Sequence, residues 1–186
     1  MFIRMANFIF QEVLNDLMDY FLLSDSENLL AYKNEKQLSD DLIYEFTSND
    51  SGDEVVQQGI MIALAGIDNL PYTILIKTEN EPSELAKEPH CLVHHQSGYI
   101  LHVVNNKIAL FTMPYLRCFT QASIDNIEQF KPVKIRLING WYNVAVYMGF
   151  LKGNEGDEPC LEFILKKEAE QPQFYADVQY MYQLGN

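Results

Sequence analysis

Cysteines, long apolar runs and basic residues are all scarce in this sequence. Its 186 residues include three cysteines, Cys91, Cys118 and Cys160, which are far apart and form no CxxC pair. That spacing offers no disulfide framework and is typical of a reducing compartment. No uninterrupted apolar stretch approaches the roughly 18 residues that a membrane-spanning helix requires. These absences predict a cytoplasmic protein without a membrane span.

The shortage of basic residues sets the electrostatics. Thirteen Lys and Arg residues stand against 26 Asp and Glu residues, and the formal net charge is −13. A surface of that sign repels phosphate backbones and anionic lipid surfaces. The sequence therefore predicts neither a nucleic-acid partner nor a membrane partner, and it favours a basic protein or a cation. The alternative is an acidic surface that serves solubility alone.

Sequence motifs of common enzymes are missing as well. The chain has no GxSxG, HExxH, P-loop or GxGxxG motif, so signatures of acyl hydrolysis, zinc proteolysis and nucleotide binding are absent. Its paired carboxylates fall in polar stretches, whereas a carboxyl group that acts as an acid needs apolar surroundings. We therefore expect a protein with no catalytic residues and no cofactor. A pocket built from distant residues is the alternative.

All four histidines lie in one stretch, HCLVHHQSGYILH, residues 90–102. Ser97-Gly98 is a natural two-residue turn, so we expect a hairpin folded about it. Because side chains alternate along a strand, Cys91, His95 and His102 then share one face and the other two histidines share the opposite face. These three are the candidate metal ligands. The expected register strains the convergence that a tetrahedral site needs, and we predict that they bind no metal.

Helical periodicity is confined to the first third of the chain. Apolar residues at i, i+3 and i+4 spacing from Phe10 to Phe21 predict a helix that follows Asn7 as its N-cap and ends near Leu23. The stretch SDDLIYEF, starting at Ser39, predicts a second short helix. Residues 47–54 are polar and are expected to form a loop.

From residue 55 onward, short apolar runs separated by turn residues predict eight or nine strands. Asn139-Gly140 and Asn105-Asn106 are expected to close tight hairpins, and FYADVQYMYQL near the C-terminus is expected to be a strand. The sequence thus predicts a single domain over 1–186, of class α+β and mainly β. In it, a helical segment over 1–50 precedes an antiparallel β-sandwich over 55–186.

Acidic stretches outside the expected strands are the candidate contacts for a basic partner. We select eight carboxylates from them: Asp40, Asp41, Asp50, Asp53, Glu54, Glu155, Asp157 and Glu158. Trp141, the single tryptophan, is added because tryptophan often anchors interfaces. Packing against the sheet is the alternative for Trp141, and solvation is the alternative for each acidic stretch.

The middle of the chain resembles a known family in its layout. QGIMIALAGIDNLPYTILIKTENEPSE is similar to the paired strands of the bacterial competence nuclease inhibitor, and LVHHQSGYILHVVNNKIALFTMP is similar to the meander that follows them. The layout over 58–150 is also similar to small acidic immunity proteins that neutralise toxins. This resemblance implies a non-enzymatic inhibitor of a basic effector such as a nuclease, and acidity would speed its association. The alternatives are a ligand-binding or enzymatic β-sandwich, and a structural subunit of a larger assembly.

Overall fold

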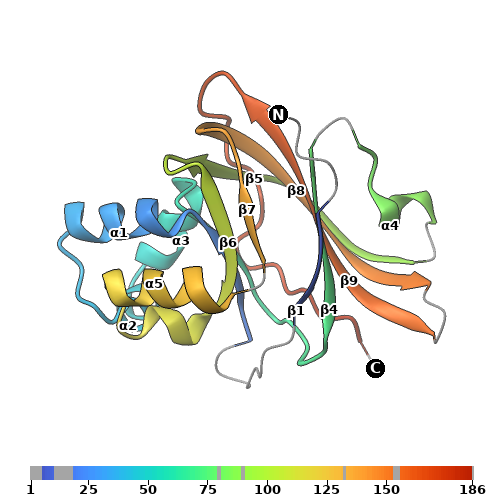
Figure 1. Ribbon diagram of the computed structural model, residues 1–186, viewed down its shortest axis with the longest axis horizontal. Helices are drawn as coiled ribbons and strands as arrows, with labels where there is room; N and C mark the ends of the chain where they lie inside the picture. The colour runs from blue at the N-terminus through green and yellow to red at the C-terminus, as the bar shows by residue number, and fades with distance from the viewer. Residues whose placement is uncertain are drawn as a thin grey trace.

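The computed structural model describes residues 6–10, 19–78, 81–88, 91–131, 133–152 and 156–185. Two β-sheets pack face to face around a shared apolar core (Figure 1). The first sheet has the strand order β1 (Ala6–Phe10), β4 (Tyr72–Thr78), β9 (Asp157–Glu168), β8 (Gly140–Lys152) and β5 (Leu92–Val103). The second has the order β3 (Met61–Leu64), β2 (Phe21–Ser24), β6 (Lys107–Thr112) and β7 (Lys134–Arg136). The predicted α+β, mainly β sandwich is confirmed, and β4 with β9 is its one parallel pair among the described strands.

Helices cover the outer faces of the two sheets unequally. Most lie on the four-stranded sheet (Figure 1). These are α1 (Ser26–Glu35), α2 (Leu42–Ser48), α3 (Ser51–Gln57), the 3-10 helix η1 (Met113–Leu116) and α5 (Gln121–Phe130). One short helix, α4 (Glu84–Lys87), lies on the outer face of the five-stranded sheet at the opposite end. The molecule therefore has a helical end and a sheet end.

Strand β8 shows how the sequence specifies the sandwich. Val144 and Val146 are fully buried in the core, whereas Asn143 before them and Ala145 between them are only partly covered. Alternation with period two puts every second side chain into the core, and each fully buried valine contributes about 1.5–3 kcal/mol. The core face expected for 133–146 is buried as predicted: Val133, Ile135, Leu137, Tyr142, Val144 and Val146.

The two Asn turns do not close hairpins, and this prediction is wrong. Residues 105–106 join β5 to β6, and residues 139–140 join β7 to β8, so both turns cross from one sheet to the other. The two crossings are tied together. The Asn139 side chain accepts from the Asn106 N–H at 2.6 Å and donates to the Val104 carbonyl at 2.7 Å. Asn139 therefore stabilises a pair of crossings, and β5 pairs with β8 while β6 pairs with β2 and β7.

The hairpin expected at Ser97-Gly98 is also wrong. β5 continues through these residues, with an irregularity in its pairing to β8 between Gln96 and Tyr99. Gly98 has φ +91°, and a Cβ built there would lie 2.4 Å from the ring of Tyr175. Glycine is therefore required for a close approach of another segment, not for a chain reversal.

The N-terminal predictions need correction. Of the helix expected between Asn7 and Leu23, residues 11–18 lie outside the described part, but Phe10 is in β1 and Phe21 is in β2. Asn7 pairs with Leu75 within β1 and β4, so it caps no helix. The rings of Phe10 and Phe21 pack edge to face in the core, with their centres 4.9 Å apart. Burial of these aromatic side chains between the sheets favours strands over a helix at both positions.

The helices that follow are partly as expected. The short helix predicted near Ser39 is confirmed as α2, which Asp41 caps by accepting from the Tyr44 N–H at 3.1 Å. The loop expected over 47–54 is wrong, because α3 begins at Ser51. Asp53 and Glu54 in its first turn favour a helix through the helix dipole.

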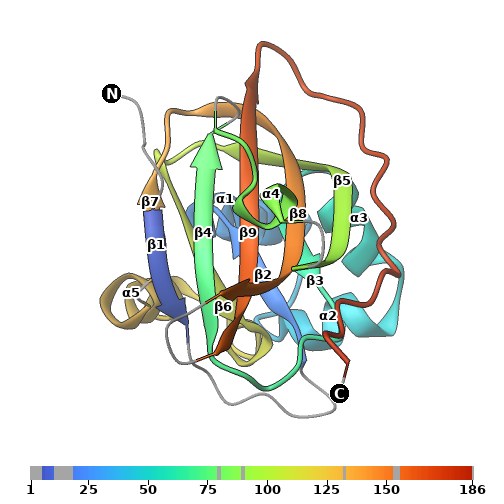
Figure 2. The ribbon, with the colours of Figure 1, turned by 90° about the vertical axis from the view of Figure 1, so that its right-hand side faces the viewer.

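The C-terminal segment, residues 171–185, is an extended strap rather than the expected strand. It crosses the edges of both sheets, from β5 to β3 (Figure 2). Its backbone touches each edge only at intervals: the Tyr175 N–H donates to the Gly98 carbonyl at 3.1 Å, and the Tyr182 N–H donates to the Ala65 carbonyl at 2.8 Å. The alternation expected for a strand is nevertheless present, because even-numbered residues face the protein and odd-numbered residues face solvent.

Candidate functional site

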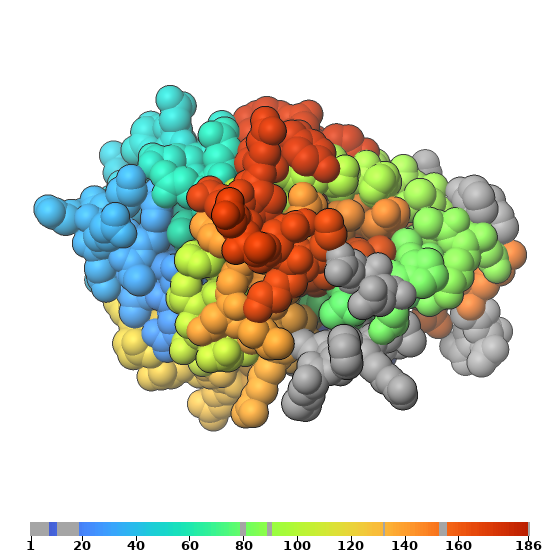
Figure 3. Space-filling view, turned by 90° about the horizontal axis from the view of Figure 1, so that it is seen from above, coloured from blue at the N-terminus to red at the C-terminus, as the bar shows by residue number. Residues whose placement is uncertain are grey.

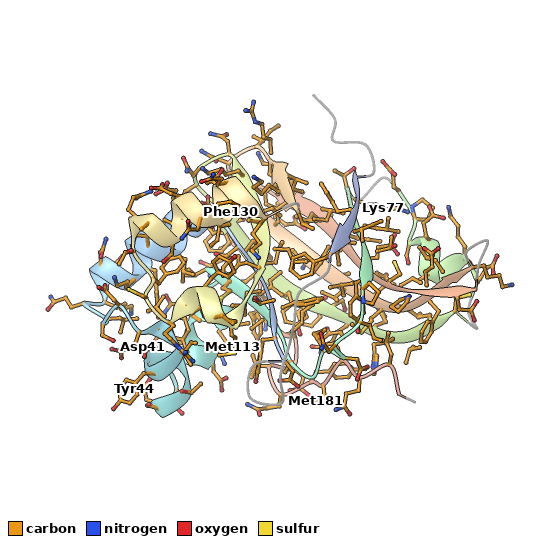
Figure 4. The ribbon with its side chains drawn as sticks, turned by 60° about the horizontal axis from the view of Figure 1, so that its bottom comes forward. Asp41, Tyr44, Lys77, Met113, Phe130 and Met181 are labelled. Carbon is orange, nitrogen blue, oxygen red and sulfur yellow. The ribbon has the colours of Figure 1, made fainter. Side chains whose placement is uncertain are left out.

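Five of the selected acidic residues gather at the helical end of the molecule: Asp40, Asp41, Asp50, Asp53 and Glu54. The segment that contains them, residues 26–58, has eight acidic residues and two lysines. Figure 4 shows Asp41 and Tyr44 at the extremity of this end. Tyr44 is 65% exposed. We call the set Asp41, Tyr44, Glu45, Asp50 and Asp53 the acidic face.

Both lysines of this segment are already engaged by neighbours. Lys33, whose side chain is 7% exposed, forms an ion pair with Asp40 and donates to the Phe119 carbonyl at 2.9 Å. Lys36 pairs with Glu54 at 3.0 Å. Pairing therefore takes up Asp40 and Glu54 and leaves the acidic face strongly negative.

Hydrogen bonds fix the geometry of the acidic face. Glu45 accepts from the Ser39 N–H at 2.9 Å, and this bond lowers the pKa of the Glu45 carboxyl. Asp50 precedes α3 without making a side-chain capping bond. Glu45 is therefore held as an anion in a fixed position, while Asp50 keeps its carboxylate available to solvent or to a partner.

A cleft of about 310 Å³ adjoins the acidic face. Its walls come from α2, α3, β2, β3, η1 and the strap. Figure 3 shows the end of the strap, in red, beside the cyan residues of α3, and Figure 4 shows Met113 and Met181 on the side that carries Asp41 and Tyr44. The inner wall is apolar and buried, with Met61 and Met113, whereas Met181 is 48% exposed.

One wall of the cleft is polar. Asp53 is the one formally charged side chain among the described residues that line it. Tyr20 lies on the same wall, and burial, together with the carboxylates of Asp19 and Asp53, raises the pKa of its phenol. Tyr20 therefore stays protonated and offers a hydroxyl beside a negative charge.

The two histidines among the candidate metal ligands, His95 and His102, stack on aromatic rings at separate places. His95 stacks on Tyr147 with ring centres 4.3 Å apart, and His102 stacks on Trp141 at 4.2 Å. Each pair joins opposite residues of β5 and β8, and the six-residue separation along β8 corresponds to about 20 Å. Cys91 packs in a separate small cluster beneath α4. Across the described ranges, no three or more His, Cys, Asp or Glu side chains could together hold a metal ion.

His94 and His90 are the other two histidines of the stretch 90–102. His94 contacts the strap, with one ring nitrogen 2.9 Å from the Tyr180 hydroxyl and the other bonded to the Gln183 carbonyl. His90 lies outside the described residues. Sequence spacing therefore suggested a dense cluster, whereas the described histidines each serve a different local contact.

Trp141 packs against the protein and does not project as an anchor. Besides stacking on His102, its ring lies close to Gly59, where an added Cβ would sit 2.8 Å from it. Burial lowers the pKa of His102, with Asp25 opposing, so the stack contains a neutral imidazole near pH 7. The packing alternative for Trp141 is therefore the one that this geometry supports.

The remaining selected acids lie far from the acidic face. Asp157 and Glu158 begin β9 at the sheet end, where Lys152 is the register partner of Asp157 and pairs with Glu88 at 3.2 Å. Glu155 lies outside the described residues. The eight selected carboxylates therefore do not form one surface.

Sequence reasoning missed a buried ionic cluster beneath α4. Lys77 and Glu162 are 1% and 0% exposed in their side chains, and their Nζ and Oε1 atoms are 3.1 Å apart. Lys77 also pairs with Glu84 at 2.7 Å, and it lies far from Asp41 (Figure 4). Burial opposes the charge of Lys77, but hydrogen bonds to Glu84 and Glu162 outweigh it and raise its pKa. One ionised residue in each of the apolar runs YTILIKT and CLEFIL was the available signal.

This buried cluster is structural in character. Glu162 accepts from the Ser83 hydroxyl at 2.6 Å and from the Glu84 N–H at 3.0 Å, so it holds the start of α4 against the sheet. Burial, then the charge of Glu162, raises the pKa of the nearby Cys160 thiol, and a protonated buried thiol is a poor nucleophile. The arrangement pins α4 in place and has no activated nucleophile.

Comparison with models of known protein families, with curated proteins and with solved structures finds no match. Among the described helices, none has the length and apolar character needed to cross a bilayer. The acidic face with its adjoining cleft is therefore the candidate site that the geometry itself defines.

Proposed function

We propose that this protein is a non-enzymatic binding protein that docks a basic protein partner on its acidic face. In this proposal it acts as an inhibitor or immunity protein for a basic effector such as a nuclease toxin. The observation that carries the proposal is the exposed Tyr44 set among carboxylates whose neighbouring lysines are already paired.

In this proposal the carboxylates attract the partner and Tyr44 makes the close contact. Carboxylates at one end of a chain of net charge −13 attract a basic partner over about 8–10 Å in physiological salt. Such steering raises the association rate more than the final affinity. Tyr44 then supplies a rigid amphipathic side chain of the kind enriched among binding hot spots.

A pull-down from the native cell tests this proposal when paired with matched charge variants. Glu45→Gln/Asp50→Asn removes two charges from the acidic face, and Asp157→Asn/Glu158→Gln removes two charges from the sheet end. We expect the wild type and the sheet-end variant to retain one basic protein stoichiometrically, and the acidic-face variant to lose it. Capture should slow as salt rises. Equal capture by both variants would contradict docking on the acidic face.

A further inference from the structure

The cleft beside the acidic face has the features of a binding site in its own right. Its volume of about 310 Å³ is at the lower end of the roughly 300–1,000 Å³ range of ligand pockets. That space equals about ten waters in the liquid, enough for one aromatic ring with a short alkyl chain. The size therefore suits a small molecule rather than a lipid or a nucleotide.

The inner wall determines what the body of a ligand must be. Met61, Met113, Val56 and Leu116 are buried and present only carbon and thioether sulfur to the space. Methionine side chains are unbranched and polarizable, so they adapt to apolar groups of different shape. Ala63 leaves room on the sheet side of the cleft. An apolar ring or branched alkyl group fits this wall.

The polar wall determines the charge of a ligand. Asp53 faces the cleft, Asp19 adds a second negative charge near Tyr20, and the described lining includes no Lys, Arg or His. An anion there would be repelled, and a neutral apolar ligand would remove water from the Asp53 carboxylate without replacing it. An ammonium group supplies both the charge and the hydrogen bond, and charge-assisted bonds of this kind are the strong ones.

We propose that the cleft binds a small amphipathic amine, with its apolar body against Met61 and Met113 and its ammonium group at Asp53. The Tyr20 hydroxyl is a second polar contact on that wall. Met181 of the strap, half-exposed beside the cleft, covers the bound molecule from outside. Asp53 belongs to both the acidic face and this cleft, but binding of the amine does not require protein docking.

An NMR titration of the full chain with three matched probes tests the proposal. The probes are 4-phenylbutylamine, 4-phenylbutan-1-ol and 4-phenylbutyrate, which share one body and differ in charge. We expect the amine to shift the amide signals of Val56, Ala63 and Val178 saturably, the alcohol to bind about tenfold more weakly, and the acid to bind least. Equal binding of amine and alcohol, or no shift at these residues, would overturn the assignment.

Variants locate the amine and separate the two proposals. Asp53→Asn should weaken amine binding about tenfold and leave alcohol binding unchanged, whereas the exposed control Asp125→Asn should change neither. The acidic-face variant Glu45→Gln/Asp50→Asn should keep amine binding within about twofold, so loss of docking and loss of this site are distinguishable. Amine binding that is insensitive to Asp53→Asn would refute the site even if the protein partner is found.

Discussion

Replacing Lys77 tests the energetics of the buried ionic cluster most sharply. In Lys77→Met the anion of Glu162 stays fully buried and loses a cation 3.1 Å away. Removing one partner of a buried pair costs about 3–5 kcal/mol. Glu162 keeps its bonds from the Ser83 hydroxyl and the backbone N–H groups of Glu84 and Leu85. We therefore expect a loss near the lower end of that range, about 3 kcal/mol.

The complementary changes isolate the charge interaction. Glu162→Gln leaves Lys77 paired with the partly exposed Glu84 at 2.7 Å, so it should cost about 1–3 kcal/mol. The double variant Lys77→Met/Glu162→Gln has no unpaired buried charge, and its cost should fall short of the sum by about 1–3 kcal/mol. Lys152→Met, which breaks only the exposed pair with Glu88, should cost at most about 1 kcal/mol.

Equilibrium unfolding in urea at pH 7 measures all four variants on one scale. A loss of about 3 kcal/mol lowers the midpoint by about 1–3 M for a typical slope m. A Lys77→Met loss no larger than that of Lys152→Met, or costs that simply add in the double variant, would show that the buried pair does not contribute as its geometry indicates.

Three further predictions concern single positions. Tyr72→Phe removes a buried hydroxyl that has no hydrogen bond of good geometry among the described residues, apart from a contact with the Asp68 backbone, so urea unfolding should show a change of at most about 1 kcal/mol in either direction. Burial lowers the pKa of Lys131 to about 8. Above that pH the unfolded chain holds a proton at Lys131 that the folded chain lacks, so the contribution of Lys131 to stability should become more favourable from pH 8 towards 10.5. The difference in unfolding free energy between the wild type and Lys131→Met should therefore shift in favour of the wild type over that range. Gly98→Ala should accelerate amide hydrogen exchange at Tyr175, because the new Cβ meets that ring. Gly156→Ala, at φ +134° with nothing within 4 Å, should not.

Local patterns predicted what depends on local physics. Alternation over 133–146 identified the buried side chains of β8 in that range, because period two holds whichever strand is the neighbour. The short helix expected from Ser39 followed from the same local logic, although α2 begins three residues later, at Leu42, with Asp41 as its N-cap. The pairing of strands did not follow from local patterns. β4 joins β9 in parallel across more than 80 residues of sequence, and no turn residue encodes that choice.

The site was less accessible to sequence reasoning than the fold. Acidic stretches were visible as composition, but the ion pairs that Lys33 and Lys36 form with their neighbours appear only in three dimensions. The cleft could not be predicted from the sequence, because Met61, Met113 and Met181 come from three elements that are distant along the chain. A methionine in an apolar run is an ordinary core residue until folding leaves space beside it.

The most direct test of the central claim is the binding kinetics of the captured basic protein as a function of ionic strength. Wild type, Tyr44→Ala, the acidic-face variant and the sheet-end variant should be compared at the same concentrations. We expect the acidic-face variant to lose association rate and salt dependence, and Tyr44→Ala to dissociate faster, while the sheet-end variant matches wild type. Identical kinetics for Tyr44→Ala, the acidic-face variant and the wild type would contradict docking through this face.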